Sequence, residues 1–233
     1  MIVTHAKPFE EILKTVEGER SVFIVGCSGC AKVCETGGEK TCAELKKKFE
    51  EAKIKVNGCT TIDFMCNKLL VLLKLSRYKE KIEIADSVIS LSCGIGVQSL
   101  SSVVDKYVHP ANNTIYLGGF QGIWPSQEKC AQCGECVLDL TGGICPITNC
   151  SKSLLNGSCG GAKNGKCEID KEFDCGWEKI YNRLKKLNKL ENFHKFSTKL
   201  RDYSKMFPPA ELRKTVFYDV ETIEEKAELK IEG

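Results

Sequence analysis

The chain has 233 residues, of which 42% are hydrophobic and 28% charged, values that are ordinary for a soluble globular protein of one or two domains. A net charge of +3 is too small to indicate a nucleic-acid or membrane-binding protein. The charged start of the chain lacks the apolar core of a signal peptide, and the longest apolar run, 69–73, is far too short to cross a bilayer. We therefore expect a cytoplasmic protein with no nucleic-acid or membrane partner.

The first half of the chain alternates between predicted helices and strands. In chain order these are a helix at 8–18, a strand at 21–25, a helix at 39–51, a strand at 53–56, a helix after Cys66, a strand at 86–91, a helix from about Gly94 and a strand at 114–117. Strand–loop–helix units repeated in this way predict a parallel sheet with helices on both faces. We therefore expect a small doubly wound α/β domain at 1–122.

Several cysteines fall near the points where a predicted strand passes into a helix. They are Cys27, Cys30, Cys59, Cys66 and Cys93. Ligands of doubly wound folds bind at this carboxyl edge of the sheet, and helix N-termini there lower the pKa of thiols. This placement predicts a metal site within the first domain.

Three of these cysteines, Cys27, Cys30 and Cys93, are the favoured ligands of that site. Cys34, Cys59 and Cys66 compete for the fourth position. We prefer Cys66 and keep Cys34 as the reserve. Cys42 falls in the middle of a predicted helix, where a buried cysteine that behaves as a small hydrophobic residue is the simpler interpretation.

A cysteine-rich segment follows, and we place it with the helix after it in a second domain at 123–195. Its cysteines are Cys130, Cys133, Cys136, Cys145, Cys150, Cys159, Cys167 and Cys175. The residues between them are mostly glycine and short polar residues, which bury too little hydrocarbon to offset the entropy of ordering the backbone. In a reducing cytosol such thiols bind metal rather than form disulfides. The three histidines lie far from the cysteine pairs, so iron–sulfur or four-cysteine zinc sites are expected.

The spacing of Cys130, Cys133 and Cys136 is that of three ligands that converge on one [4Fe-4S] cube. We group this triple with one cysteine from further along the chain, and expect a second four-thiolate site among the rest. The remaining candidates are Cys145, Cys150, Cys159, Cys167 and Cys175. The chain would thus hold two or three [4Fe-4S] clusters, and one of the sites could be a zinc site.

The chain lacks the HExxH and GxSxG motifs and has no histidine beside a plausible nucleophile, so we assign no catalytic residue. Several clusters without a substrate site indicate electron transfer from one cluster to another. Residues 177–195 predict one amphipathic helix, and residues 196–233 predict an extended C-terminal arm.

Four stretches of the chain resemble a known family. They are VGCSGCAKVCETGGEK, SLSCGIGVQ, CAQCGECVLDLTGGICPITNCSKSLLNGSCGGAKNGKCE and DCGWEKIYNRLK. Together they are similar to the MetV family, the small iron–sulfur subunits of bacterial methylenetetrahydrofolate reductase. The resemblance covers about residues 1–190.

The resemblance implies a flavin-containing TIM-barrel partner subunit that reduces 5,10-methylenetetrahydrofolate to the 5-methyl form in the acetyl-CoA pathway. The small subunit would pass electrons from an upstream donor to that flavin. Two other hypotheses remain open. One is a zinc-thiolate methyl-transfer or corrinoid-interacting protein, and the other is disulfide reduction at the N-terminal site.

Overall fold

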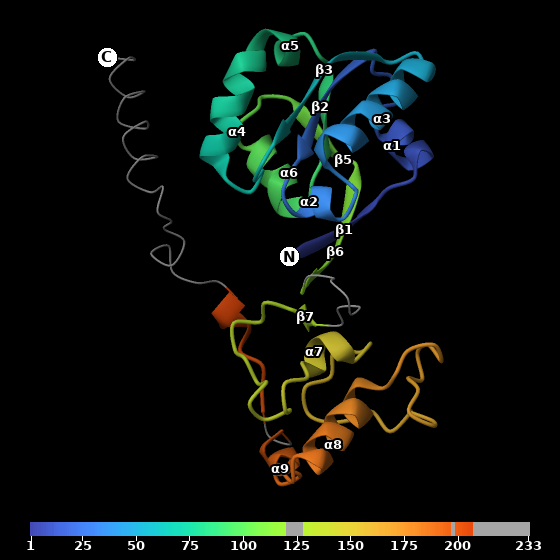
Figure 1. The fold of residues 1–233 in the computed structure, drawn as a ribbon, viewed down its shortest axis with the longest axis vertical. Coiled ribbons are helices and arrows are strands. Elements are labelled where there is room, and N and C mark those ends of the chain that lie inside the picture. The colour runs from blue at the N-terminus through green and yellow to red at the C-terminus, as the bar shows by residue number, and fades with distance from the viewer. Residues whose placement is uncertain (120–127, 197–198, 207–233) are drawn as a thin grey trace, which may run out of the picture. The chain divides into compact units, whose positions relative to one another are not determined.

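The structure is a computed structural model, and it describes residues 1–119, 128–196 and 199–206. The chain divides into two compact units, Met1–Phe120 and Gln121–Gly233, and Figure 1 labels the elements of each. Trp124, Pro208, Pro209 and most of the predicted C-terminal arm lie outside the described residues. No helix within the described ranges is both long enough and apolar enough to cross a membrane.

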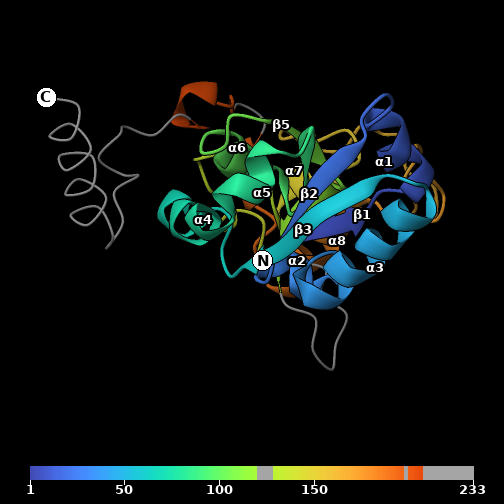
Figure 2. The same ribbon diagram turned by 90° about the horizontal axis from the view of Figure 1, so that it is seen from above.

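The N-terminal unit is built on a four-stranded parallel sheet. Its strands, in spatial order, are β3 (Lys55–Ile62), β2 (Ser21–Cys27), β4 (Ser87–Leu91) and β5 (Tyr107–Pro110). The helices of this unit are α1 (Phe9–Thr15), α2 (Cys30–Val33), α3 (Gly38–Glu51), α4 (Lys68–Leu75), α5 (Lys79–Glu83) and α6 (Gly94–Ser101), with a short 3-10 helix η1 (Ser76–Tyr78). Figure 2 shows α4, α5 and α6 on one side of β2 and β3, and α1 and α3 on the other. The predicted parallel α/β sheet is confirmed.

Each face of this sheet has its own apolar core, and β2 contributes to both because all of its residues are buried. Phe23 and Val25 pack with α4 and α6 on one face, and Val22 and Ile24 pack with α1 and α3 on the other. Burying one such side chain contributes roughly 1.5–3 kcal/mol. Hydrophobic burial on two faces therefore accounts for the stability of this unit.

The strand predicted at 114–117 does not join the parallel sheet. It lies in β6 (Asn112–Gly118), which pairs antiparallel with β1 (Ile2–Ala6), a strand that we did not predict. The fourth parallel strand is β5, whose four residues YVHP carry almost no apolar pattern and end in proline. Such a short edge strand is held by its neighbour β4 rather than by its own sequence.

The C-terminal unit contains short elements joined by long irregular segments. They are β7 (Lys129–Cys130), α7 (Pro146–Asn149), α8 (Gly176–Lys186), α9 (Asn192–Phe196) and the 3-10 helix η2 (Tyr203–Met206). A small apolar core joins α8 to the cysteine-rich segment. Its buried members are Val137, Cys175, Trp177, Ile180 and Leu184. Most of this hydrocarbon comes from α8, so the segment folds against the helix and does not form a core alone.

The single helix predicted at 177–195 is wrong, because the helix ends at Lys186 and α9 begins at Asn192. Asn188 follows the last turn of α8 with φ +54°, in the left-handed region. The N–H of Lys189 then donates to the carbonyl of Leu184 at 2.9 Å, which closes a Schellman motif. The apolar pattern of the sequence continues past this point, but the helix does not.

Candidate functional site

Four cysteines of the N-terminal unit lie at the carboxyl edge of the parallel sheet. Cys27 ends β2, Cys30 begins α2, Cys93 is the N-cap of α6, and Cys66 lies between β3 and α4. The strands that carry them are neighbours in the order β3-β2-β4. Their ends are level, because Cys27 pairs with Ile62 of β3 and the preceding residue pairs with the end of β4.

The loop from Cys27 to Cys30 packs directly on the loop that carries Cys66. The N–H of Ser28 donates to the carbonyl of Ile62 at 2.8 Å, and the Cys27 thiol lies 3.9 Å from the carbonyl of Asp63. Only glycine fits at position 29, since a Cβ there would lie 2.7 Å from the Asp63 carbonyl oxygen. The two loops can therefore pack closely because Gly29 has no side chain.

Glu39, in the first turn of α3, forms hydrogen bonds to three segments of this edge: the loop after β2, helix α2 and the end of β3. Its carboxylate accepts hydrogen bonds from Lys32 at 2.9 Å, Thr61 at 3.1 Å and Ser28 at 3.3 Å. The hydrogen bond from Lys32, with that from Thr61, lowers the pKa of Glu39 from 4.5 to about 2. Sequence reasoning did not identify this residue, because a glutamate in a first helical turn is common whatever its partners.

Electrostatics link the four thiols. Partial burial raises the pKa of the Cys66 thiol, and the charges of Cys27, Cys93 and Cys30 raise it further. Cys27 and Cys93 are buried, Cys30 is half-buried and Cys66 is exposed. The structure thus brings into one neighbourhood the same four cysteines that the sequence favoured.

These thiols do not converge on a single point. In the described parts of the chain, no three Cys, His, Asp or Glu side chains are grouped closely enough to hold a metal ion. A tetrahedral zinc site with Zn–S distances of about 2.3 Å would need sulfur atoms on the order of 4 Å apart. All fifteen cysteines are free thiols, so no disulfide competes for them.

The other cysteines of this unit point elsewhere. Cys34, the reserve ligand, lies 3.9 Å from the carbonyl of Ile2 in β1. Cys42 is buried as expected, and burial, with a contribution from the charge of Cys59, raises its pKa to about 12. Cys59 lies inside β3, because that strand is longer than the predicted 53–56. It is therefore beside Cys42 and not at the strand's end.

In the C-terminal unit, Cys130 and Cys145 lie on two segments that are joined. Cys130 ends β7 and Cys145 is the N-cap of α7. The hydroxyl of Thr148 in α7 donates to the carbonyl of Lys129 in β7 at 3.1 Å. Cys133, which is half-buried, and Cys136, which is exposed, follow β7 in a loop.

The other four cysteines of this unit lie on segments that contact one another, one of which leads into α8. Cys175 is the N-cap of α8 and is buried in the apolar core, against which Cys150 packs. The Cys167 thiol lies 3.5 Å from the Ser151 hydroxyl, a hydrogen bond that lowers the pKa of Cys167. Gly161, two residues after Cys159, lies against Glu168, the neighbour of Cys167. Cys150, Cys159, Cys167 and Cys175 are thus on adjoining segments.

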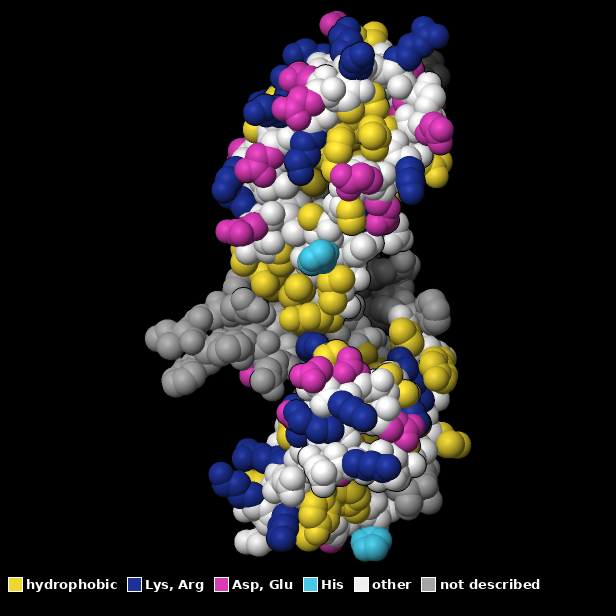
Figure 3. Space-filling model, turned by 90° about the vertical axis from the view of Figure 1, so that its right-hand side faces the viewer, with side chains coloured by type: hydrophobic (Ala, Val, Ile, Leu, Met, Phe, Trp, Pro, Cys, Tyr) yellow, Lys and Arg dark blue, Asp and Glu magenta, His cyan; other side chains and the backbone are white. Residues whose placement is uncertain are grey.

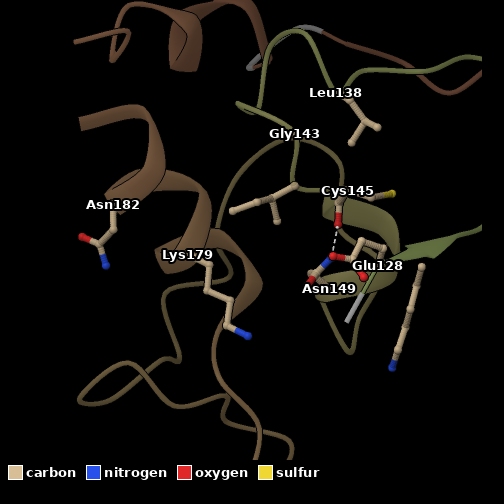
Figure 4. A pocket seen from close by; sticks show the side chains of 9 residues that line it. Glu128, Leu138, Gly143, Cys145, Asn149, Lys179 and Asn182 are labelled. Atoms are coloured by element: carbon tan, nitrogen blue, oxygen red, sulfur yellow. Dashed lines mark hydrogen bonds between the residues drawn. The ribbon is translucent and has the colours of Figure 1, made fainter. Parts of the chain in front are cut away.

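A pocket of about 570 Å³ opens beside Cys145. Figure 4 shows Lys179 and Asn182 extending from α8 on one side and Cys145 and Asn149 on the other. The amide of Asn149 donates to the carbonyl of Cys145 at 3.0 Å, which steadies the start of α7. Sequence reasoning did not identify Lys179 and Asn182, because they fit the solvent-exposed side of an amphipathic helix.

Part of the sequence is similar to a known protein family. Residues 109–204 match a family model described as methylene-tetrahydrofolate reductase C terminal. The match contains the eight cysteines from Cys130 to Cys175 and none of those from Cys27 to Cys93. It links the chain to methylenetetrahydrofolate reductase-related proteins. No curated protein and no solved structure matches the chain.

Proposed function

We propose that this chain is an iron–sulfur electron-transfer subunit that delivers electrons to the flavin of a partner methylenetetrahydrofolate reductase subunit. The main support is the family match, because the matched residues carry the dense cysteine segment and the family is named for that reductase. Reduction of 5,10-methylene- to 5-methyltetrahydrofolate takes up two electrons and two protons, which the partner's flavin would deliver. A chain with many cysteines that can bind iron suits the supply of those electrons.

The donor set fits iron–sulfur clusters by its chemistry, since each proposed site offers four thiols and no nitrogen or oxygen ligand is needed. In the N-terminal unit, Cys27, Cys30, Cys66 and Cys93 would hold one cluster. In the C-terminal unit we assign Cys130, Cys133, Cys136 and Cys145 to a second cluster, and Cys150, Cys159, Cys167 and Cys175 to a third. A bound [4Fe-4S] cluster supplies an acceptor and donor of single electrons.

Several structural features near these cysteines would stabilise the negative charge of a thiolate or a cluster. Cys93 and Cys175 are the N-caps of α6 and α8, where the positive end of the helix dipole favours a thiolate. Met65, which is fully buried, belongs to the same apolar cluster as Cys27 and helps to exclude water from that thiol. Low solvent exposure and backbone N–H groups near the sulfur atoms are among the features that set the reduction potential of a cluster.

The edge that carries the N-terminal thiols also exposes apolar side chains. Val33, Phe64 and Ile95 are 56%, 57% and 48% exposed, and each belongs to one of the segments that carry the thiols. Exposed apolar residues grouped in this way are typical of protein–protein contacts. This observation supports a partner subunit near the N-terminal thiols.

The test is anaerobic purification of the full chain with a coexpressed flavoprotein subunit, followed by iron, sulfide and zinc analysis. We expect a brown protein with about four irons for each occupied site, whose visible absorbance bleaches with dithionite. A colourless protein that contains zinc alone would instead support the zinc-thiolate methyl-transfer hypothesis. An iron–sulfur protein that cannot reduce the partner's flavin would refute the proposed direction of electron flow.

A further inference from the structure

The exposed side of α8 is strongly cationic. Helix α8 carries Lys179, Arg183, Lys185 and Lys186, and these four residues are hereafter the cationic face of α8. Lys179, Arg183 and Lys186 recur at the spacing of one helical side, which flanks the side that buries Ile180 and Leu184, and Lys185 projects from a different exposed side. Within the helix the only acidic residue is Glu178.

The helix dipole explains only part of this charge. Cations in the last turn stabilise a helix, which accounts for Arg183, Lys185 and Lys186. It does not account for Lys179, which lies near the N-terminus, where the dipole disfavours a cation. Lys179 lies 3.2 Å from Asp174, but that carboxylate is shared with Lys166 at 2.7 Å. Glu178 precedes Lys179 on the helix, and Glu128 and Lys129 line the same pocket, so the positive charge at this end of α8 is only partly neutralised.

The cationic face adjoins the pocket beside Cys145. Lys179 lines that pocket, as Figure 4 shows, and Arg183 donates from Nε to the carbonyl of Gly142 at 3.2 Å. Gly142 has φ +65°, and a Cβ at this position would lie 3.0 Å from the Arg183 side chain. The loop that leads to Cys145 is thus packed onto the cationic face.

We infer that the cationic face of α8 and the adjoining pocket form the docking surface for a small acidic electron-carrier protein. This inference rests on the proposed function, in which Cys145 holds a cluster. The carrier would give up one electron and the acceptor near Cys145 would take it, with no bond formed or broken. A carrier docked on α8 would approach the chain where one of the proposed ligands borders a pocket.

Interface physics favours a transient carrier over the flavoprotein as the occupant of this surface. Electron-transfer encounters are small and weak, and charge complementarity raises their association rates. Permanent subunit contacts are larger and more apolar. Over the face of the N-terminal unit in Figure 3, by contrast, Lys and Arg side chains are intermixed with Asp and Glu.

The experiment measures binding of a purified acidic ferredoxin to the full chain by calorimetry at low and high salt. The variant K185E/K186E reverses two exposed charges of the cationic face. The control K46E/K47E makes the same charge change on α3, where the half-buried Lys46 and the exposed Lys47 pair with Glu50 and Glu51. Circular dichroism checks that both variants fold.

We expect K185E/K186E to weaken ferredoxin binding by about tenfold or more at low salt, and the control to change it by less than about twofold. The difference should vanish at high salt, because exposed charges are then screened. Absence of binding by the native chain, equal losses in both variants, or binding that ignores salt would overturn the inference. The inference would also be overturned if K185E/K186E no longer bound the flavoprotein but still bound ferredoxin as the native chain does.

The same preparations separate this inference from the proposed function. Iron content and bleaching by dithionite test the clusters and need no carrier. Ferredoxin binding tests the cationic face and needs no turnover. A chain that lacks iron but binds ferredoxin through α8 would refute the proposed function and keep the docking surface.

Discussion

At the scale of single residues, the position of Cys66 decides whether the N-terminal edge can offer four thiols. Cys27, Cys30 and Cys93 come from two neighbouring strands and the helices after them, whereas Cys66 comes from the loop after the third. Burial raises the pKa of the Cys66 thiol, and the charge of each of the other three cysteines raises it further. Cys34, the alternative, faces the carbonyl of Ile2.

We predict that Cys66→Ser lowers the iron content of the anaerobically purified chain by about four atoms, because a cluster with three thiolates is poorly retained. Cys34→Ser is the matched control and should leave iron unchanged. Iron is measured per chain by mass spectrometry of the metal. If Cys34→Ser lost the iron and Cys66→Ser kept it, the assignment of the fourth ligand would be wrong.

Cys133 allows a parallel test in the C-terminal unit, where it is the middle member of the Cys130–Cys136 triple. We predict that Cys133→Ala removes about four irons or prevents folding, because cluster binding and folding are coupled. Iron analysis and size-exclusion chromatography measure the two outcomes. Unchanged iron in a soluble protein would count against the triple as a cluster site.

Glu39 gives a prediction about pH. Its pKa is about 2 in the folded chain against an ordinary 4.5, so its hydrogen bonds stabilise the edge fully above pH 4.5 and are lost as pH falls toward 2. Glu39→Gln should therefore weaken hydrogen-exchange protection of residues 28–33 near neutral pH. At about pH 1, well below the folded pKa of about 2, Glu39 is protonated and the variant and the native chain should differ little. Because Glu39 is exposed, added salt should shrink the difference, and a gap that persists at low pH would contradict this account.

At the scale of elements, the end of α8 shows what sequence periodicity misses. Apolar residues continue at helical spacing as far as Phe193, yet the chain turns at Asn188 with a positive φ. Asparagine tolerates this conformation better than most residues, but the signal is a single residue within a long amphipathic pattern. The existence of the helix was predictable, and its end was not.

We predict that Asn188→Ala destabilises the C-terminal unit by about 1 kcal/mol, because alanine is strained in the left-handed region. Asn188→Gly should be neutral or stabilising, since glycine has no Cβ. Urea unfolding followed by the fluorescence of Trp177, which is buried in this unit, reports the change, provided that Trp124 is replaced by Phe in all samples. An equal loss in both variants would mean that the asparagine side chain, and not its backbone angle, matters.

The sheet shows where the sequence sufficed. The buried runs of β2 and β4 were predictable from their β-branched and apolar residues, and they place Cys27 and Cys93 at one edge. β3 was predicted too short because Asn57, Gly58 and Cys59 interrupt its apolar pattern. Its register with β2 extends it to Ile62, and this long-range pairing moves Cys59 away from the edge. Local sequence cannot show such pairing.

At the scale of the whole molecule, the two units differ in how much apolar core they contain. Among the described residues, the N-terminal unit has two buried clusters of 12 and 10 residues, and the C-terminal unit has one of five. The larger clusters are enough for a small domain of 119 described residues, whereas the smaller one serves the 77 described residues of the C-terminal unit (69 in 128–196 and 8 in 199–206), which include many exposed glycines and cysteines. Stability of the C-terminal unit should therefore depend on metal–thiolate bonds far more than that of the N-terminal unit.

This difference leads to a prediction about metal removal. Treatment of the anaerobic full-length protein with an iron chelator under mildly oxidising conditions, followed by a thiol reductant, should leave hydrogen-exchange protection in β2 and β4 nearly unchanged. Protection in α7 and α8 should fall strongly, because loss of a structural metal removes folding free energy. Refolding with iron and sulfide should restore it. If α8 stayed protected without metal, the small core around Trp177 would be sufficient alone, and the main physical reason for placing clusters in this unit would be lost.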